Sequence, residues 1–198
     1  MTTLPFSQAC ENNKAPILAV LKRVLKDSHQ VLEIGSGTGQ HAVYFSAHLP
    51  HLMWQPSDQQ AYLDGLKLRV EAEPQKNLFT PLELDVLNPM WPKGFDAVFS
   101  ANTAHIMPWS TAQHMLQRVA NSLAKTGIFA LYGPFNYEGK YTSESNARFD
   151  EWLKQGAAHQ GIRHFEDIQA QLENCGMRLL EDNALPANNR LLVFQKHQ

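Results

Sequence analysis

The 198-residue chain is predicted to form an α/β fold: a seven-stranded, mostly parallel sheet with an antiparallel last strand and helices on both faces. Short runs of β-branched and aliphatic residues alternate with segments whose apolar residues recur at helical spacing, the pattern of repeated strand and helix units. One early run breaks into alternating glycines, as in a tight turn from a strand into a helix. The last two runs are joined by only a few residues, which makes the two strands antiparallel neighbours.

Each expected strand is a short apolar run that ends in polar or turn-forming residues. The run around Val31 and Ile34 has the composition of a parallel strand that is buried on both faces. The expected strands are residues 31–34, 53–57, 78–84, 95–101, 128–132, 177–185 and 190–195.

The expected helices carry apolar residues three and four positions apart. Pro16 suits the first turn of the first helix, and the polar group Glu11 to Lys14 before it either caps that helix or binds a ligand. Ser110 and Gln113 have the spacing of a capping box. The apolar stripes mark helices over about residues 15–26, 42–49, 62–70, 115–123, 149–153 and 168–175, the last ended by Gly176.

The segment from Val31 to Gln40 predicts a strand, a tight turn and a helix, with a ligand against the backbone of the turn. Gly35, Gly37 and Gly39 have no Cβ that would hold such a ligand away. Dinucleotide sites usually have the spacing G-x-G-x-x-G and place a pyrophosphate on the helix N-terminus, but here the third glycine comes one residue early. Glu33, two residues before the first glycine, would repel a phosphate and attract an ammonium group.

The resulting pattern E-x-G-x-G-x-G resembles motif I of the class I S-adenosylmethionine (SAM) methyltransferases, whose cofactor carries an ammonium and a sulfonium group in place of phosphates. The resemblance implies the Rossmann-like sheet of that class, with SAM as cofactor and S-adenosylhomocysteine (SAH) as product. The alternative is that the glycines only make a tight connection between strand and helix. The cofactor-binding residues implied by the motif are Glu33, Gly35, Ser36, Gly37, Thr38 and Gly39.

Acids also follow the second and third expected strands. Asp58 comes about 20 residues after the glycine turn, where an acid in such a unit accepts hydrogen bonds from ribose hydroxyls. The alternative is that Asp58 caps the next helix. At Asp85 the resemblance implies an acceptor for the adenine amino group, with Val86 packed on the ring, although an Asp after a strand is otherwise a turn residue.

A polar and aromatic loop, residues 102–109, follows the fourth expected strand. Ligands of open α/β sheets bind outside the carboxyl ends of the strands, so this loop is the best candidate for the reaction centre. We assign Asn102 to the cofactor side and His105 to the acceptor side, where an imidazole orients the nucleophile or takes its proton. The alternative is a histidine that only bonds a backbone group. The loop lacks N-P-P-Y/F, the signature of many amino-methylating enzymes, which argues against that mechanism.

Further segments resemble the methyltransferase-like protein 26 family along nearly the whole chain. The matching segments are E-N-N-K-A-P-I-L, V-L-E-I-G-S-G-T-G-Q-H-A, W-Q-P-S-D, N-T-A-H-I-M-P-W, L-Y-G-P-F, T-S-E-S-N-A-R-F-D and P-A-N-N. The resemblance implies one SAM-dependent methyltransferase domain over residues 1–198, with the N-terminal helix and residues 133–165 covering the active site. It leaves the acceptor open. Asn12 stands where the family pattern has an arginine, which argues against anion binding there.

The matching residues outside the SAM motifs are polar and are expected in loops on one side of the sheet. They predict a neutral, amide-rich and aromatic pocket for a small polar acceptor; the alternative is that the asparagines only stabilise turns. The candidate catalytic residues among them are His105, Tyr132, Asn136 and Asn146. The other pocket candidates are Asn13, Ser143, Asn188 and Asn189.

Composition excludes several classes of partner. The net charge is -2 and no cluster of Lys and Arg is present, which argues against a nucleic-acid partner. Cys10 and Cys175 lack the spacing of metal ligands, so no metal is expected. No apolar stretch approaches the roughly 18 residues of a membrane span, and the start of the chain has no signal-peptide pattern. A cytoplasmic protein is therefore predicted, with its oligomeric state left open.

The leading functional prediction is methyl transfer from SAM to an uncharged or modestly polar acceptor, either a small molecule or an exposed protein side chain. Because the sulfonium carbon is already electrophilic, the protein contributes mainly alignment and exclusion of water. One alternative is a non-catalytic module that binds SAM or docks a partner. The other is an NAD(P)-dependent oxidoreductase, which the glycine spacing and the lack of a Tyr-x-x-x-Lys pair oppose.

Overall fold

The computed structural model describes residues 4–197, and its main feature is a seven-stranded sheet of order β3-β2-β1-β4-β5-β9-β8. The pairs from β3 to β5 are parallel, whereas β9 is antiparallel to both β5 and β8. The predicted fold class is thereby confirmed. The strands of this sheet are β1 (Gln30–Ile34), β2 (Met53–Asp58), β3 (Leu82–Glu83), β4 (Ala97–Ala101), β5 (Ile128–Gly133), β8 (Met177–Leu185) and β9 (Asn189–Lys196).

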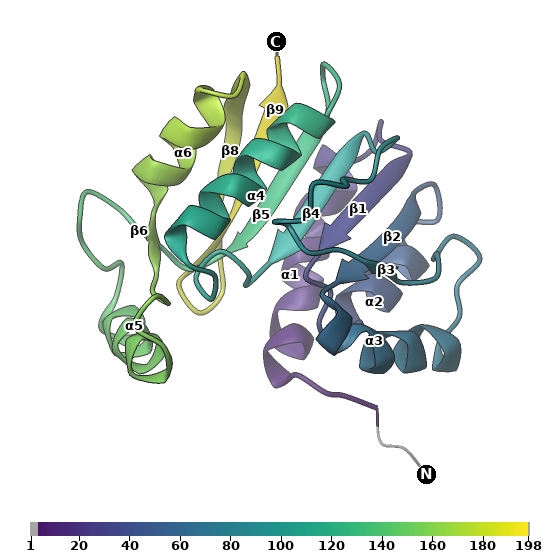
Figure 1. Cartoon of the computed structure of the whole chain (residues 1–198), viewed down its shortest axis with the longest axis horizontal. Coiled ribbons are helices and arrows are strands. Elements are labelled where there is room, and N and C mark those ends of the chain that lie inside the picture. The colour runs from purple at the N-terminus through teal and green to yellow at the C-terminus, as the bar shows by residue number, and fades with distance from the viewer. Residues whose placement is uncertain (1–3, 198) are drawn as a thin grey trace.

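Helices cover both faces of the sheet. In Figure 1, α4 and α6 lie over one face, and α1 and α2 lie over the other. A separate pair of short parallel strands, β6 (Phe135–Asn136) and β7 (Arg163–His164), flanks α5. The helices are α1 (Gln8–Val24), α2 (Gln40–His48), α3 (Gln60–Ala72), α4 (Trp109–Ser122), α5 (Glu144–Gly156) and α6 (Phe165–Glu173).

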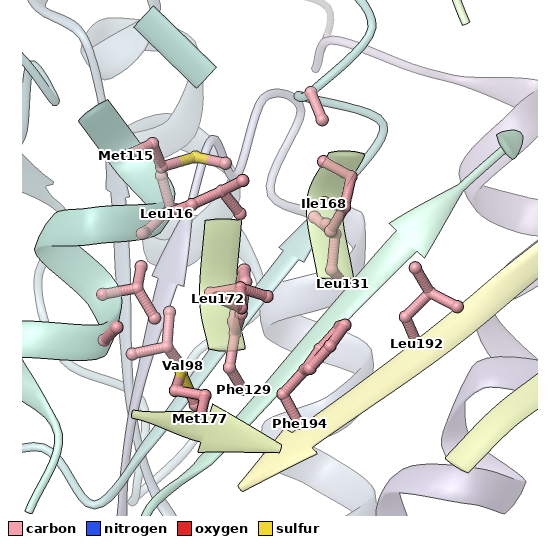
Figure 2. Packing of buried hydrophobic residues seen from close by; sticks show 14 of the residues in the cluster. Val98, Met115, Leu116, Phe129, Leu131, Ile168, Leu172, Met177, Leu192 and Phe194 are labelled. Carbon is pink, nitrogen blue, oxygen red and sulfur yellow. The ribbon is translucent and has the colours of Figure 1, made fainter. Parts of the chain in front are cut away.

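Two hydrophobic clusters hold these layers together. On the face of α4 and α6, side chains from both helices interlock with those of β5 and β9; Figure 2 shows Met115, Leu172, Phe129 and Phe194 among them. On the other face, α1 and α2 pack against the sheet around Phe45 and the aromatic residues of β2 and β4. Burying each such side chain contributes about 1.5–3 kcal/mol, so apolar packing fixes the sheet beneath the site.

The first helix begins earlier than the sequence predicted. It starts at Gln8, where Ser7 Oγ accepts a hydrogen bond from the backbone N–H of Cys10 at 3.4 Å. Pro16 lies inside the helix and has no N–H to donate to the carbonyl four residues earlier. The polar group Glu11 to Lys14 is therefore part of α1, and the expectation that it caps the helix is wrong.

Two other local predictions are wrong in their details. The third strand contains only Leu82–Glu83, while Leu78 forms an isolated bridge, because Pro81 between them cannot donate to the sheet. The expected capping box at Ser110 does not form, because α4 already begins at Trp109 and its N-cap, Pro108, has no side-chain donor or acceptor.

The end of α6 also differs slightly from the expectation. Asn174 is the C-cap, and Gly176 follows two residues later with a left-handed φ of 75°. A glycine adopts this conformation without the steric cost of a Cβ, so Gly176 directs the chain from the helix into β8.

Candidate active site

A cavity of about 1100 Å³ lies at the carboxyl ends of the parallel strands. In Figure 1 these ends point towards the lower edge of the sheet, where α5 and the first turns of α1 lie. Small-molecule sites usually enclose about 300–1,000 Å³, so this volume leaves room for a cofactor and a second small molecule. The predicted site residues in its wall are Gly35, Ser36, Gly37, Thr38, Asp58, Asp85, Val86, Asn102, His105, Tyr132 and Asn146.

Five predicted residues lie outside the cavity wall: Glu33, Gly39, Asn136, Ser143 and Asn188. Glu33 is buried beneath the glycine turn, and Gly39 packs against α3. Asn136 is also buried, and its Oδ1 has no hydrogen-bond partner within residues 4–197. Glu33 still bonds to Ser36 of the glycine turn, and Gly39 is the last glycine of that turn.

The glycines of the turn have different functions. A Cβ on Gly35 would lie 2.5 Å from Cγ2 of Thr103, and one on Gly39 would lie 2.9 Å from Cδ1 of Leu66, so both positions require glycine for packing. A Cβ on Gly37 would meet nothing within 4 Å, and this residue, with φ of 53°, borders the cavity. Gly37 is therefore the glycine that opens the backbone to a ligand.

Asp58, the last residue of β2, is tied to the glycine turn. Its Oδ2 accepts a hydrogen bond from the N–H of Gly37 at 2.7 Å, and its Oδ1 accepts one from Gln59 at 2.8 Å. Burial raises the pKa of this carboxyl, while the two backbone bonds oppose the rise. Because α3 has Gln59 as its N-cap and no side-chain capping bond, Asp58 does not cap the helix.

The next two predicted residues follow β3. Asp85 is partly exposed and its Oδ1 accepts a hydrogen bond from the N–H of Leu87 at 2.9 Å, while Val86 is buried. Both also line the cavity. The Asp85 carboxylate thus stabilises a turn, which was the alternative to a role in adenine binding. Asp85 nevertheless borders the cavity.

Glu33 supports the glycine turn from below. It is 2 % exposed, its Oε2 accepts a hydrogen bond from Nε1 of Trp54 at 2.9 Å, and the Ser36 side chain also bonds to it. Burial raises the pKa of Glu33 to about 7, and the nearby Asp58 carboxylate acts in the same direction. The side chain is therefore close to its titration point at neutral pH, behind the cavity wall.

The loop after β4 brings His105 to the cavity. The ring is 6 % exposed and lies edge-on to Phe149 of α5, with 5.5 Å between ring centroids. Burial, with a smaller effect of Arg163, lowers the pKa of His105 to about 4, so the imidazole is neutral at physiological pH. Arg163 holds the loop by donating to the carbonyls of Ala104, at 2.9 Å, and Met107.

Asn13 and His41 form a buried polar pair in the same wall. Nε2 of His41 lies 2.6 Å from Oδ1 of Asn13, and the ring stacks on Phe45 with 5.1 Å between centroids. Burial lowers the pKa of His41 to about 4. Burial also raises the pKa of the Tyr132 hydroxyl, against hydrogen bonds from Asn13 and Asn189.

The sequence interpretation assigned no site role to His41. The available signal was its position, as the second residue of the helix that follows the glycine turn. Side chains in the first turn of such a helix lie next to the ligand-binding edge of the sheet.

Asn146 comes from the first turn of α5. Its Nδ2 donates to Oγ1 of Thr142 at 2.9 Å and to the carbonyl of Asn188 at 3.2 Å. Both amide hydrogens are thus used within the protein, and Oδ1 is the atom that it offers to a ligand. Ser143 instead caps α5, because its Oγ accepts a hydrogen bond from the backbone N–H of Asn146.

The N-terminal segment, residues 5–13, is fastened to the glycine turn by two side chains that the sequence interpretation missed. Gln40 Oε1 accepts hydrogen bonds from the N–H of Ser7 at 2.6 Å and from Oγ1 of Thr38 at 2.9 Å. Arg69 donates to the carbonyls of Pro5, at 2.6 Å, and Thr38, at 3.3 Å. Several residues of this segment line the cavity, so these bonds fix one of its walls.

Residues 4–197 lack two classes of feature. No group of three or more His, Cys, Asp and Glu side chains in this range is placed to hold a metal ion. No helix in the same range is both long and apolar enough to cross a membrane.

Solved methyltransferase structures share this fold. An O-methyltransferase family protein from Burkholderia thailandensis matches with a TM-score of 0.83 at 15% identity, over 96% of this chain and 58% of its own. Human N-acetylserotonin methyltransferase in complex with SAM matches with a TM-score of 0.81 at 15% identity, over 96% of this chain and 53% of its own. The structure "PigF with SAH" matches with a TM-score of 0.75 at 18% identity, over 92% of this chain and 55% of its own.

These comparisons place the fold among methyltransferases, including structures that hold SAM and SAH. The chain spans little more than half the length of the solved structures that it matches. A family model matches residues 4–196, and the chain therefore belongs to the family described as "Protein of unknown function (DUF938)".

Proposed function

We propose that the protein is a SAM-dependent methyltransferase acting on a small polar molecule or a protein side chain. The observation that carries this proposal is the composition of the cavity wall, which combines the open backbone of the glycine turn and two acids with the neutral polar side chains of His105, Tyr132 and Asn146. Similarity to methyltransferase structures supports it. These neutral polar side chains argue against a module that only binds SAM, because such a module needs no place for an acceptor.

The residues present fit SAM as cofactor. The space beside Gly37 suits the close approach of a ligand to the backbone, and we propose that Gly35, Ser36, Thr38 and Asn102 complete this part of the site. When bound, SAM supplies a methyl group on a cationic sulfur and leaves as SAH.

The two acids of the wall would hold the nucleoside part of the cofactor. We propose that Asp58 accepts hydrogen bonds from the ribose hydroxyls and that Asp85 accepts one from the adenine amino group, with Val86 against the ring. Glu33 and Gly39 would act indirectly, by fixing the turn from behind.

The neutral polar side chains of the wall would bind the acceptor. His105 is neutral and can take a proton, and we propose that it receives the one that the acceptor loses. A hydroxyl becomes strongly acidic as its oxygen forms a new bond to carbon, so even a weakly basic imidazole suffices. Tyr132 and Asn146 would orient the acceptor, and Asn136, which lies outside the wall, would act through its neighbours.

Several broader predictions go with this proposal. We propose that residues 1–198 form one domain in which the N-terminal helix and residues 133–165 cover the site, since both supply residues to the cavity wall. Relationship to the methyltransferase-like protein 26 family, a cytoplasmic location and the lack of a nucleic-acid partner are predictions from the sequence.

A thermal-shift experiment tests the proposed cofactor. Ligand at 100 times its dissociation constant stabilises the folded state by about 2.7 kcal/mol, which raises the melting temperature of a protein of this size by roughly 5–10 °C. SAM and SAH are expected to give such a shift, and NADH and NADPH none. Equal shifts with NADH would favour the oxidoreductase alternative instead.

A further inference from the structure

We propose that the acceptor is an uncharged small molecule that presents a hydroxyl group, and that the acceptor half of the cavity selects against phosphates, carboxylates and protonated amines. This inference rests on the proposed function, because it concerns the second molecule in the same cavity. It excludes the charged Lys and Arg side chains of proteins as acceptors. The acceptor half of the cavity is defined here by Asn13, His41, His105, Tyr132, Asn146 and Phe149.

In the described part of the chain, the cavity wall offers no cation to pair with an anionic acceptor. Among the cavity-lining residues in the described range 4–197, none is Lys, Arg or Glu. The acids in the wall are Asp58 and Asp85, at the ends of β2 and β3, and Asp58 already accepts two backbone hydrogen bonds. An anion would therefore find no cation, and an ammonium group would find no carboxylate in the acceptor half.

The cations around this half are occupied elsewhere, and Lys14, which acts on His41, is paired with Glu11. Arg163 donates to three backbone carbonyls, among them those of Ala104 and Met107. Arg190 is paired with Asp182, where its Nε lies 2.7 Å from Oδ1. Neither guanidinium is in the cavity wall.

Four titratable side chains in the cavity wall also favour their neutral forms. Burial lowers the pKa values of His41 and His105 to about 4, and it raises those of Tyr132 and Cys10. All four shifts favour the neutral form at physiological pH. Burial that disfavours a charge on these side chains also disfavours a charge on a ligand placed beside them.

The polar atoms that remain suit a hydroxyl group. A neutral imidazole and the amide oxygen of Asn146 accept hydrogen bonds, whereas binding an ammonium ion in a buried site requires a paired carboxylate. Phe149 belongs to the same half, and Ile106 and Met107, from the loop that carries His105, also line the cavity, so these apolar side chains provide contact for a carbon skeleton.

The test uses four probes that share one ring and differ in the head group: benzyl alcohol, benzylamine, benzoate and phenyl phosphate. SAH binding is measured first by calorimetry, and its absence would contradict the proposed function itself. The probes are then titrated into SAH-loaded protein and followed by ligand-observed NMR. We expect benzyl alcohol to bind at least tenfold more tightly than each charged probe.

A pair of variants locates the effect. Asn146→Lys places a cation in the wall and is expected to tighten benzoate binding at least tenfold, with SAH affinity unchanged. Gln155→Lys adds the same charge at an exposed position of α5 outside the wall and should leave the order of the probes as in the wild type. Circular dichroism checks the fold of both variants, and if Asn146→Lys fails to fold, the wild-type titrations decide.

The results that would contradict the proposed acceptor class differ from those that would contradict the proposed function. If SAH binds but a charged probe binds as tightly as benzyl alcohol, or none of the four probes binds, then the acceptor is not of the proposed class. A gain in benzoate binding with Gln155→Lys equal to that with Asn146→Lys would also overturn it, because the effect would then come from net charge.

Discussion

Two carboxyl groups lie on opposite sides of the glycine turn. Asp58 borders the cavity and bonds the N–H of Gly37, whereas Glu33 is buried beneath the turn and bonds Trp54. A ligand in the cavity therefore meets Asp58 directly and Glu33 only through the shape of the turn. Substitutions of these residues have different expected effects.

Asp58→Asn is expected to weaken SAM binding and to leave the fold intact. The amide keeps one acceptor for the N–H of Gly37 but loses the charge that would bind the ribose hydroxyls. Hydrogen bonds to charged groups contribute about 1.5–3 kcal/mol, so calorimetry should show a dissociation constant roughly 10- to 150-fold higher. Unchanged affinity would mean that Asp58 only braces the turn.

Glu33→Gln is expected to remove a pH dependence of stability. Because the folded state raises the pKa of this carboxyl from 4.5 to about 7, its favourable contribution is complete below pH 4.5 and is lost as the pH rises through 7. The glutamine keeps an acceptor for Nε1 of Trp54. The stability of the variant relative to wild type should therefore increase by about 3 kcal/mol between pH 4.5 and pH 8.

Urea unfolding at a series of pH values measures this difference. The histidines at positions 41 and 105 titrate in the same range, but both proteins contain them and their effect cancels in the comparison. A difference that stays constant from pH 4.5 to 8 would show that Glu33 does not titrate in the folded state as described.

At the scale of elements, α3 holds the N-terminal segment in place through one side chain. Arg69 bonds the carbonyls of Pro5 and Thr38, so it connects residues before α1 to the glycine turn. The position of the cavity wall formed by the start of α1 therefore depends on Arg69, a residue of α3.

Arg69→Met is expected to loosen this wall. The variant loses the bonds to both carbonyls but keeps much of the aliphatic contact. Limited proteolysis should cleave within residues 5–13 faster than in the wild type, and SAH should dissociate several-fold faster. Lys67→Met removes a charge from the same helix and serves as the control; an equal effect of both variants would assign the change to charge alone.

Most strands were predictable from the sequence, because apolar runs such as Ile128–Gly133 are buried on both faces and therefore uniformly apolar. The glycine turn and Asp58 were also predictable, since their signals are local. The start of α1 was not predictable, because proline normally occurs in the first turn of a helix. In this protein Pro16 lies inside α1, eight residues after its first residue, Gln8. The pair of Asn13 and His41 joins residues 28 positions apart, so only the fold brings it together.

For the molecule as a whole, part of the apolar core lies away from the cavity, although other core residues, such as Ile34 and Leu84, also line it. The cluster of α4 and α6 includes Leu172, which is fully buried and is not among the cavity-lining residues. Leu172→Ala is expected to lower the free energy of unfolding by about 2–5 kcal/mol through the cavity that it creates. SAH affinity per folded molecule should stay unchanged, because Leu172 does not border the cavity; a parallel loss of affinity would show that this part of the core is coupled to the site.

Arg163 also links two distant parts of the molecule. Its bonds to the carbonyls of Ala104 and Met107, together with the 2.9 Å bond from the N–H of Gly161 to the carbonyl of His105, join residues 161–163 to the loop after β4. The position of the chain between α5 and β7 is thus tied to that of His105. The arrangement is an interlock: residues 161–163 cannot separate from the loop that carries His105 unless these three hydrogen bonds break.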